Sequence, residues 1–147
     1  MIGLFNKMNN KVLLGTSAGH NIEIYTKMNT INFIGNTLDT KINMMQGGIL
    51  LLKKSDILFK IISEWYNICS NYHLINNSPS LIPNVDGFID HRNDQSILSL
   101  LALKYNLINY DIDPTWCGGN WHECAKKWPI WALRNKSGYD AIQDLKV

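Results

Sequence analysis

Several features that would narrow the class of this protein are missing from its sequence. No apolar stretch approaches the ~20 residues that a helix needs to cross a bilayer, so no membrane span is expected. Lysine and arginine never occur more than two in a row, and the net charge is only +2. Proteins that bind nucleic acid through its phosphates carry a basic patch or stripe. Nucleic acid is therefore not an expected partner.

Cysteine is also scarce. The three cysteines, Cys69, Cys117 and Cys124, are an odd number and widely spaced, which indicates free thiols in a reducing compartment and predicts a cytoplasmic protein. A zinc site built from Cys117, His122 and Cys124 would lack the paired Cys-x2-Cys of most structural zinc sites. A thiol hydrolase that uses His91 with Cys69 or Cys117 would lack an identifiable third group. Both alternatives are disfavoured.

The composition, 46% hydrophobic and 18% charged, is that of a globular protein and predicts a single domain over residues 1–147. Three short strands are expected, at residues 11–15, 48–52 and 107–112. The continuous apolar run at residues 48–52 is typical of a strand that is buried on both faces. A helix is expected from Thr26, its N-cap, to a stop at Gly35. The order of strands and helices predicts an α/β fold.

Two longer helices follow the helical period. In the first, Ser55 stands as the N-cap, Asp56 lies in the first turn and apolar residues recur up to Cys69. The second, at residues 94–105, is expected to bury Ile97, Leu98, Leu101 and Tyr105. Between them, residues 76–90 form a long irregular segment, and loops of that length are usually functional or mobile.

Two polar stretches have no obvious role in a core. His91, Arg92, Asp94 and Gln95 stand just before an apolar helix, where free N–H groups and the helix dipole favour an acidic side chain. A solvated helix cap, with Arg92 paired to Asp90 or Asp94, is the alternative, and the residues by themselves favour it. Residues 46–48 place two glycines before an apolar strand, which allows a ligand or another backbone to come close. A tight turn into the strand is the alternative.

Together these stretches resemble GT-A-type nucleotide-sugar glycosyltransferases, of the family 8-like kind found in capsule synthesis and in viruses. The similarity lies in residues 23–27, in residues 46–51, in residues 91–98 and in the closing segment 129–134, and it spans residues 23–134. The resemblance implies a partial GT-A-like mixed sheet with flanking helices that lacks the N-terminal nucleotide-binding half. It covers the acceptor side of such an enzyme.

The resemblance also implies roles for single residues. Asp94 would orient an acceptor hydroxyl or act as its base, and Gln95 would lie near the reacting anomeric carbon. His91 and Arg92 would hold sugar hydroxyls or diphosphate oxygens, the arginine through paired hydrogen bonds. A further set would line the substrate pocket: Tyr25, Lys27, Gln46, Gly47, Gly48 and Arg134.

The relatives bind Mn²⁺ or Mg²⁺ through an Asp-x-Asp at the end of a strand in the N-terminal half. Here Asp111-Ile112-Asp113 has the same letters, but it follows the acceptor-side helix and is interpreted as the end of a strand. A divalent metal is thus implied by the resemblance only, and its ligands stay unknown. The donor half is expected on another chain or in a longer gene, unless the chain is a relic.

The expected activity is transfer of a hexose from a nucleotide-sugar to a glycan or protein acceptor, weak or absent in this chain alone. The alternative is a non-catalytic carbohydrate-binding or assembly subunit on the same half-fold. The tryptophans of the C-terminal segment would suit either a sugar-stacking platform or a contact with the missing half.

Overall fold

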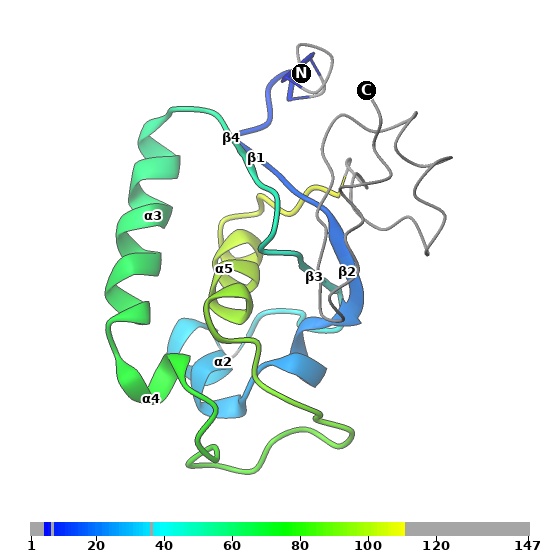
Figure 1. The fold of residues 1–147 in the computed structure, drawn as a ribbon, viewed down its shortest axis with the longest axis vertical. Coiled ribbons are helices and arrows are strands. Elements are labelled where there is room, and N and C mark those ends of the chain that lie inside the picture. The colour runs from blue at the N-terminus through cyan, green and yellow to red at the C-terminus, as the bar shows by residue number, and fades with distance from the viewer. Residues whose placement is uncertain (1–4, 7, 36, 111–147) are drawn as a thin grey trace, which may run out of the picture. The chain divides into compact units, whose positions relative to one another are not determined.

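The structure, a computed structural model, describes residues 5–6, 8–35 and 37–110. These residues belong to one compact unit that is a mixed α/β fold, as predicted, with four α-helices and two small antiparallel sheets in its described part. Helix α5 (Asn93–Lys104) lies between helix α3 on one side and the strands on the other (Figure 1). The single domain over residues 1–147 stays a prediction, because residues 111–147 lie outside the described part.

Each sheet has two strands. Strand β1 (Leu13–Leu14) pairs with β4 (Leu51–Leu52), and β2 (Ser17–Asn21) pairs with β3 (Asn43–Met45). The predicted strand at residues 11–15 is confirmed at its centre, where Leu14 lies opposite Leu51. The prediction of a doubly buried strand at residues 48–52 is wrong, since only two residues pair and Leu52 is 42% exposed. The length of an apolar run does not determine how many of its residues pair with a neighbouring strand.

The single mixed sheet expected from the resemblance is not formed by the described residues. The third strand is predicted at residues 107–112, and among its described residues, 107–110, only Tyr110 makes a ladder contact, an isolated parallel bridge with Gly15. The Tyr110 hydroxyl donates a hydrogen bond to the carbonyl oxygen of Asn43. Tyr110 therefore connects the chain after α5 to β3 and to Gly15, the residue that follows β1.

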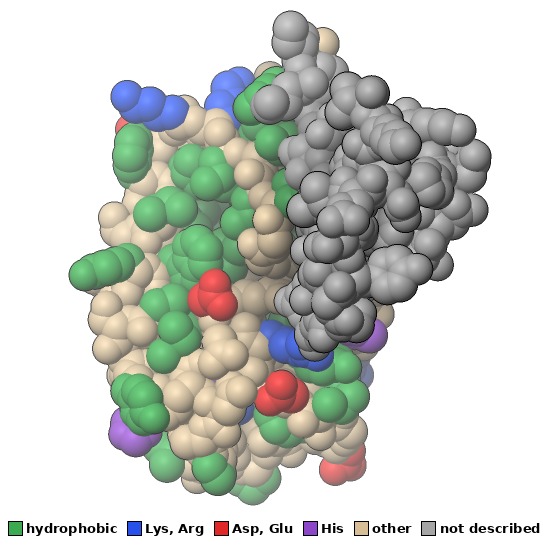
Figure 2. Space-filling view, in the orientation of Figure 1, with side chains coloured by type: hydrophobic (Ala, Val, Ile, Leu, Met, Phe, Trp, Pro, Cys, Tyr) green, Lys and Arg blue, Asp and Glu red, His purple; other side chains and the backbone are tan. Residues whose placement is uncertain are grey.

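Helix α3 (Asp56–Cys69) forms as its sequence predicts. The Ser55 hydroxyl accepts a hydrogen bond from the Leu58 N–H at 3.3 Å, which satisfies one of the free donors of the first turn. Ile61 and Ile68 are buried against the core. The opposite side of the helix also carries apolar groups, because Phe59 and Tyr66 are 57% and 72% exposed, and Figure 2 shows hydrophobic side chains at the surface on this side.

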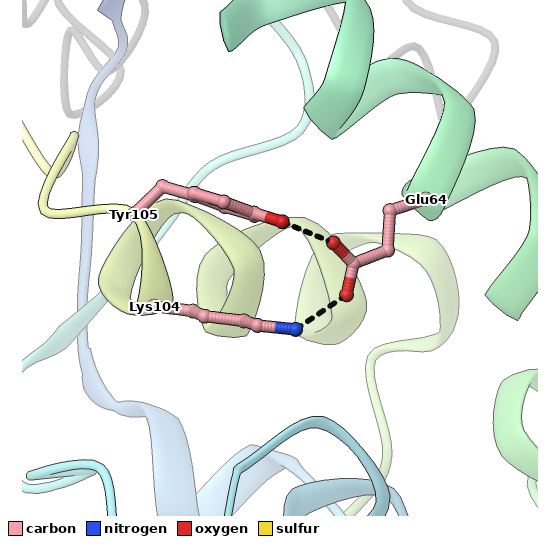
Figure 3. A network of polar contacts seen from close by, with 3 residues as sticks. All are labelled: Glu64, Lys104 and Tyr105. Atoms are coloured by element: carbon pink, nitrogen blue, oxygen red, sulfur yellow. Dashed lines mark hydrogen bonds and ion pairs between the residues drawn. The ribbon is translucent and has the colours of Figure 1, made fainter.

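A polar contact joins α3 to the end of α5 (Figure 3). The Glu64 carboxylate accepts hydrogen bonds from Lys104 Nζ and the Tyr105 hydroxyl, each at 2.6 Å. Burial alone would raise the pKa of Glu64, but these two hydrogen bonds and the charges of Lys104 and Lys60 together lower the pKa below its usual value. Because both charged side chains remain partly exposed, we expect a contribution of less than about 1 kcal/mol to stability.

The central part of helix α5 is enclosed on all sides. Every residue from Ser96 to Ala102 is buried, whereas an amphipathic helix would bury one face only. The predicted burial of Ile97, Leu98 and Leu101 is confirmed, and Tyr105 is partly buried. Core residues of α2, α3 and β3 pack around the helix. Its N-terminal end therefore has a fixed position relative to most of the described fold.

Residues 76–90, here called the strap, are irregular but anchored at several points. The strap follows helix α4 (Tyr72–Ile75) and crosses the start of helix α2 (Met28–Gly35). Asn84 Oδ1 accepts from the Met28 N–H at 2.8 Å and so caps α2 from a distance. The predicted Thr26 cap is wrong, since α2 begins two residues later and no described residue hydrogen-bonds the buried Thr26 hydroxyl.

Candidate functional site

The N-terminal end of α5 collects most of the residues that the sequence predicted for a site. Tyr25 arrives from the short 3₁₀ helix η1 (Ile22–Tyr25), and its carbonyl oxygen accepts from the Arg92 N–H at 3.1 Å. The Arg92 guanidinium lies over the Tyr25 ring, 4.8 Å from its centroid. Such a contact attracts the cation to the ring face and limits the orientations of its long side chain. Two residues 67 positions apart thus come together, with the exposed Arg92 held over the ring of Tyr25, which is only 8% exposed.

Arg92 does not form the ion pair that a solvated helix cap would use. Among the described residues, neither Asp90 nor Asp94 makes a salt bridge with it, and the only ion pair there joins Lys104 to Glu64. Asp90 Oδ1 instead accepts from the His91 N–H at 2.8 Å. The Arg92 side chain is exposed, so its positive charge faces solvent on an aromatic support. This arrangement suits recognition of an anionic group.

Residues 46–48, here called the glycine turn, lie beside the same helix end. A Cβ placed on Gly47 would come within 3.7 Å of the Gln95 Cβ, whereas one on Gly48 would meet nothing within 4 Å. Gln46 is fixed by Thr16, which donates from its hydroxyl to Gln46 Oε1 at 2.9 Å and accepts from the Gln46 N–H at 2.8 Å. The turn therefore brings exposed backbone next to the Gln95 side chain.

Asp94 lies in the first turn of α5 and is exposed. Its carbonyl oxygen accepts from the Trp65 indole N–H at 3.1 Å, which ties this turn to α3. Burial, and secondarily the Asp94 charge, raise the pKa of the Cys69 thiol to about 11. A thiol with that pKa stays protonated at neutral pH and is a poor nucleophile. The structure thus gives no support to a hydrolase that uses Cys69.

His91 has a structural role in this arrangement. The ring is 2% exposed, its Nδ1 accepts from the Lys27 N–H at 3.4 Å, and its Nε2 donates to the Leu74 carbonyl oxygen at 2.9 Å. Both nitrogens are therefore used inside the protein. Burial is the main cause that lowers the pKa of His91 to about 4, so the ring is neutral at pH 7. Binding of a sugar hydroxyl by His91 stays a prediction that would require these hydrogen bonds to break.

This buried histidine predicts loss of stability in mild acid. The unfolded chain binds a proton at His91 near its usual pKa of 6.5, whereas the folded chain does so only near 4. Stability is therefore present above pH 6.5 and falls as the pH drops toward 4. When the pH falls from about 7 to about 5, the free energy of unfolding should decrease in both proteins. We expect the decrease to be about 1–2 kcal/mol smaller in His91→Gln than in the wild type. Urea unfolding at both pH values measures this, and equal losses in the two proteins would contradict it.

Lys27 is also buried, at 1% exposure. Its Nζ donates to the strap, to the carbonyl oxygen and Oδ1 of Asn76 at 2.8 and 2.9 Å and to the carbonyl oxygen of Ser78 at 3.5 Å. Burial lowers the pKa of this ammonium. Lys27 therefore anchors the strap, and lining of a substrate pocket by its side chain stays a prediction that would need the strap to open.

Sequence reasoning missed three residues that shape this end of α5. The His20 ring lies against the Tyr25 ring at a centroid distance of 4.9 Å, and Trp65 and Ser96 hydrogen-bond the backbone there. Ser96 gave a usable signal, because it is a polar residue at the start of an apolar helical run. The sequence around His20 gave no such signal, because the contact of its ring with Tyr25 depends on the path of the chain through η1.

Other candidate residues lie outside the described part of the chain. They are Arg134, the Asp111 and Asp113 pair, and Cys117, His122 and Cys124. Within residues 5–6, 8–35 and 37–110, no three His, Cys, Asp or Glu side chains gather closely enough to hold a metal ion. No ligand set for the implied Mn²⁺ or Mg²⁺ can be named there. The same residues contain no helix with the length and apolar character of a bilayer span.

Comparisons with known proteins returned no relative: no family model, no curated protein and no solved structure matches this chain.

Proposed function

We propose that this chain is the acceptor-side part of a GT-A-type glycosyltransferase, which transfers a hexose from a nucleotide-sugar to a glycan or protein. The observation that carries the proposal is the convergence of Tyr25, Gly47 and Arg92–Gln95 at the start of α5. These residues come from three separate segments, and the resemblance implies a role for each of them except Asn93.

Each residue has a role that its position supports. Arg92, supported by Tyr25 and unpaired among the described carboxylates, would bind diphosphate oxygens. Asp94, exposed in the first turn of α5, would accept the proton of the attacking acceptor hydroxyl. Gln95, beside Gly47, would contact the donor sugar near its anomeric carbon. A divalent cation, when bound, would neutralise charge on the leaving diphosphate, and a donor half would supply its ligands.

The proposal is tested by calorimetric titration with UDP and UDP-hexoses, with and without Mn²⁺. The wild-type chain is expected to bind UDP, and Arg92→Ala to bind it about tenfold more weakly through loss of a charge-assisted contact. Lys41→Ala removes an exposed cation elsewhere on the surface and is the matched control. A well-folded wild type that binds none of these ligands would contradict a donor site in this chain.

A second prediction concerns the chemical step. Asp94→Asn is expected to slow hexose transfer at least about 100-fold, because a general base contributes a factor of that size. UDP affinity and thermal stability should change little, since the Asp94 side chain is exposed. Asp86→Asn, an exposed aspartate in the strap, is the control. Full transfer activity in the Asp94 variant would remove this carboxylate from the mechanism. Sugar binding without transfer by the wild type would favour the non-catalytic binding subunit.

A further inference from the structure

Two serines of α5 are fully buried although they stand among apolar residues. Ser96 and Ser99 both have 0% exposure and lie three positions apart, so they share one side of the helix. A buried hydroxyl is costly unless it finds partners. A serine inside a helix usually finds one locally, at the carbonyl four residues earlier. Both serines also bond to segments outside the helix.

Ser96 closes a ring of three hydrogen bonds. Its hydroxyl donates to the Tyr25 carbonyl oxygen at 2.6 Å and accepts from the Arg92 N–H at 2.9 Å. The same Arg92 N–H also donates to the Tyr25 carbonyl oxygen at 3.1 Å. The backbones of Tyr25 and Arg92 are thereby held together at the point where their side chains form the cation–π pair.

Ser99 makes the equivalent connection for the glycine turn. Its hydroxyl accepts from the Met45 N–H at 3.0 Å and donates to the Gln95 carbonyl oxygen at 2.8 Å. Met45 is the last residue of β3 and directly precedes Gln46, and the Gln95 side chain lies against Gly47. Ser99 therefore fixes the distance between the strand that leads into the glycine turn and the first turn of α5.

We infer that Ser96 and Ser99 are a pair of positioning residues, each of which sets one half of the candidate site. Ser96 places Arg92 over Tyr25, and Ser99 places Gln95 beside Gly47. The positions themselves follow from the hydrogen bonds, whereas their use in binding a nucleoside diphosphate rests on the proposed function. Each hydroxyl acts through other residues, and neither is assigned a contact with substrate.

The positioning is tested first without any ligand, by NMR of the folded chain. The Tyr25 ring current shifts the Arg92 Nε–H resonance, so Ser96→Ala should move this resonance toward that of an unstacked arginine. Ser99→Ala should leave it in place and shift the Gln95 side-chain amide and Gly47 N–H resonances instead. Thr30→Val is the matched control, because it removes another 0% exposed hydroxyl, bonded only to the Leu74 carbonyl oxygen. It should move neither set of resonances.

Titration with UDP and Mn²⁺ gives the functional measurement. We expect Ser96→Ala to weaken UDP binding by about three- to tenfold, the range that loss of one hydrogen bond produces, with no change for Thr30→Val. Ser96→Cys keeps a weak donor of similar size and replaces the alanine variant if that does not fold. An unchanged Arg92 Nε–H resonance in the folded Ser96 variant would overturn the inference for Ser96, and unchanged Gln95 and Gly47 resonances in folded Ser99→Ala would overturn it for Ser99. A wild type that binds no UDP would instead refute the proposed contact between Arg92 and a diphosphate, and the ligand-free spectra would still decide the positioning.

Discussion

Replacing Lys27 with methionine is expected to lower the free energy of unfolding by about 3 kcal/mol, because a buried charged donor is lost from a set of neutral acceptors. The Lys27 ammonium is held by Asn76 and Ser78, and no described carboxylate contributes. Methionine fills a similar volume but cannot donate, so the Asn76 acceptors lose these bonds. Urea unfolding measures the loss, and limited proteolysis of the strap should become faster.

Lys53→Met is the matched control for this prediction. Lys53 is exposed, and its Nζ donates only to the carbonyl oxygen of Asn9. Its replacement should change stability by no more than about 0.5 kcal/mol. A Lys27→Met protein as stable as the wild type would contradict the prediction. Such a result would mean that apolar replacement of this buried ion is neutral, as it is in some proteins. It would then follow that the bonds of Ser80 and Asn84 to α2 hold the strap by themselves.

Shortening a buried side chain of α5 should destabilise the protein on either side of the helix. Leu98 and Leu100 stand two positions apart and so point about 200° from each other, yet they are 2% and 0% exposed. We expect Leu98→Ala and Leu100→Ala each to lower the free energy of unfolding by about 3–4 kcal/mol, the usual cost of a cavity in a core. Denaturant titration of the two variants measures both effects.

Leu81→Ala provides the comparison, because Leu81 is 81% exposed on the strap. Its cost should stay within about 0.5 kcal/mol. If Leu100→Ala were equally mild while Leu98→Ala was costly, α5 would be an ordinary amphipathic helix with one open face. That result would also place Ser96 and Ser99 in doubt as residues buried inside the fold.

Local sequence determined the helices well. Ser55 and Asp56 mark the start of α3, and the apolar period from Ile57 onward fixes its buried face, so no distant contact is needed to predict it. The start of α2 could not be predicted in this way. Thr26 has the residue type of an N-cap, but the donor at Met28 is satisfied by Asn84, 56 residues away. A cap supplied by tertiary structure leaves no local signal.

The sequence by itself thus determined the α/β class and the two long helices, and it singled out the polar residues at the start of α5. Only the tertiary structure decided which of those polar residues face solvent. His91 and Arg92 are neighbours in sequence, yet His91 is enclosed by hydrogen bonds to Lys27 and Leu74, while Arg92 is exposed over Tyr25. Burial depends on which distant parts of the chain pack against a side chain, and the local sequence around His91 and Arg92 does not specify those contacts.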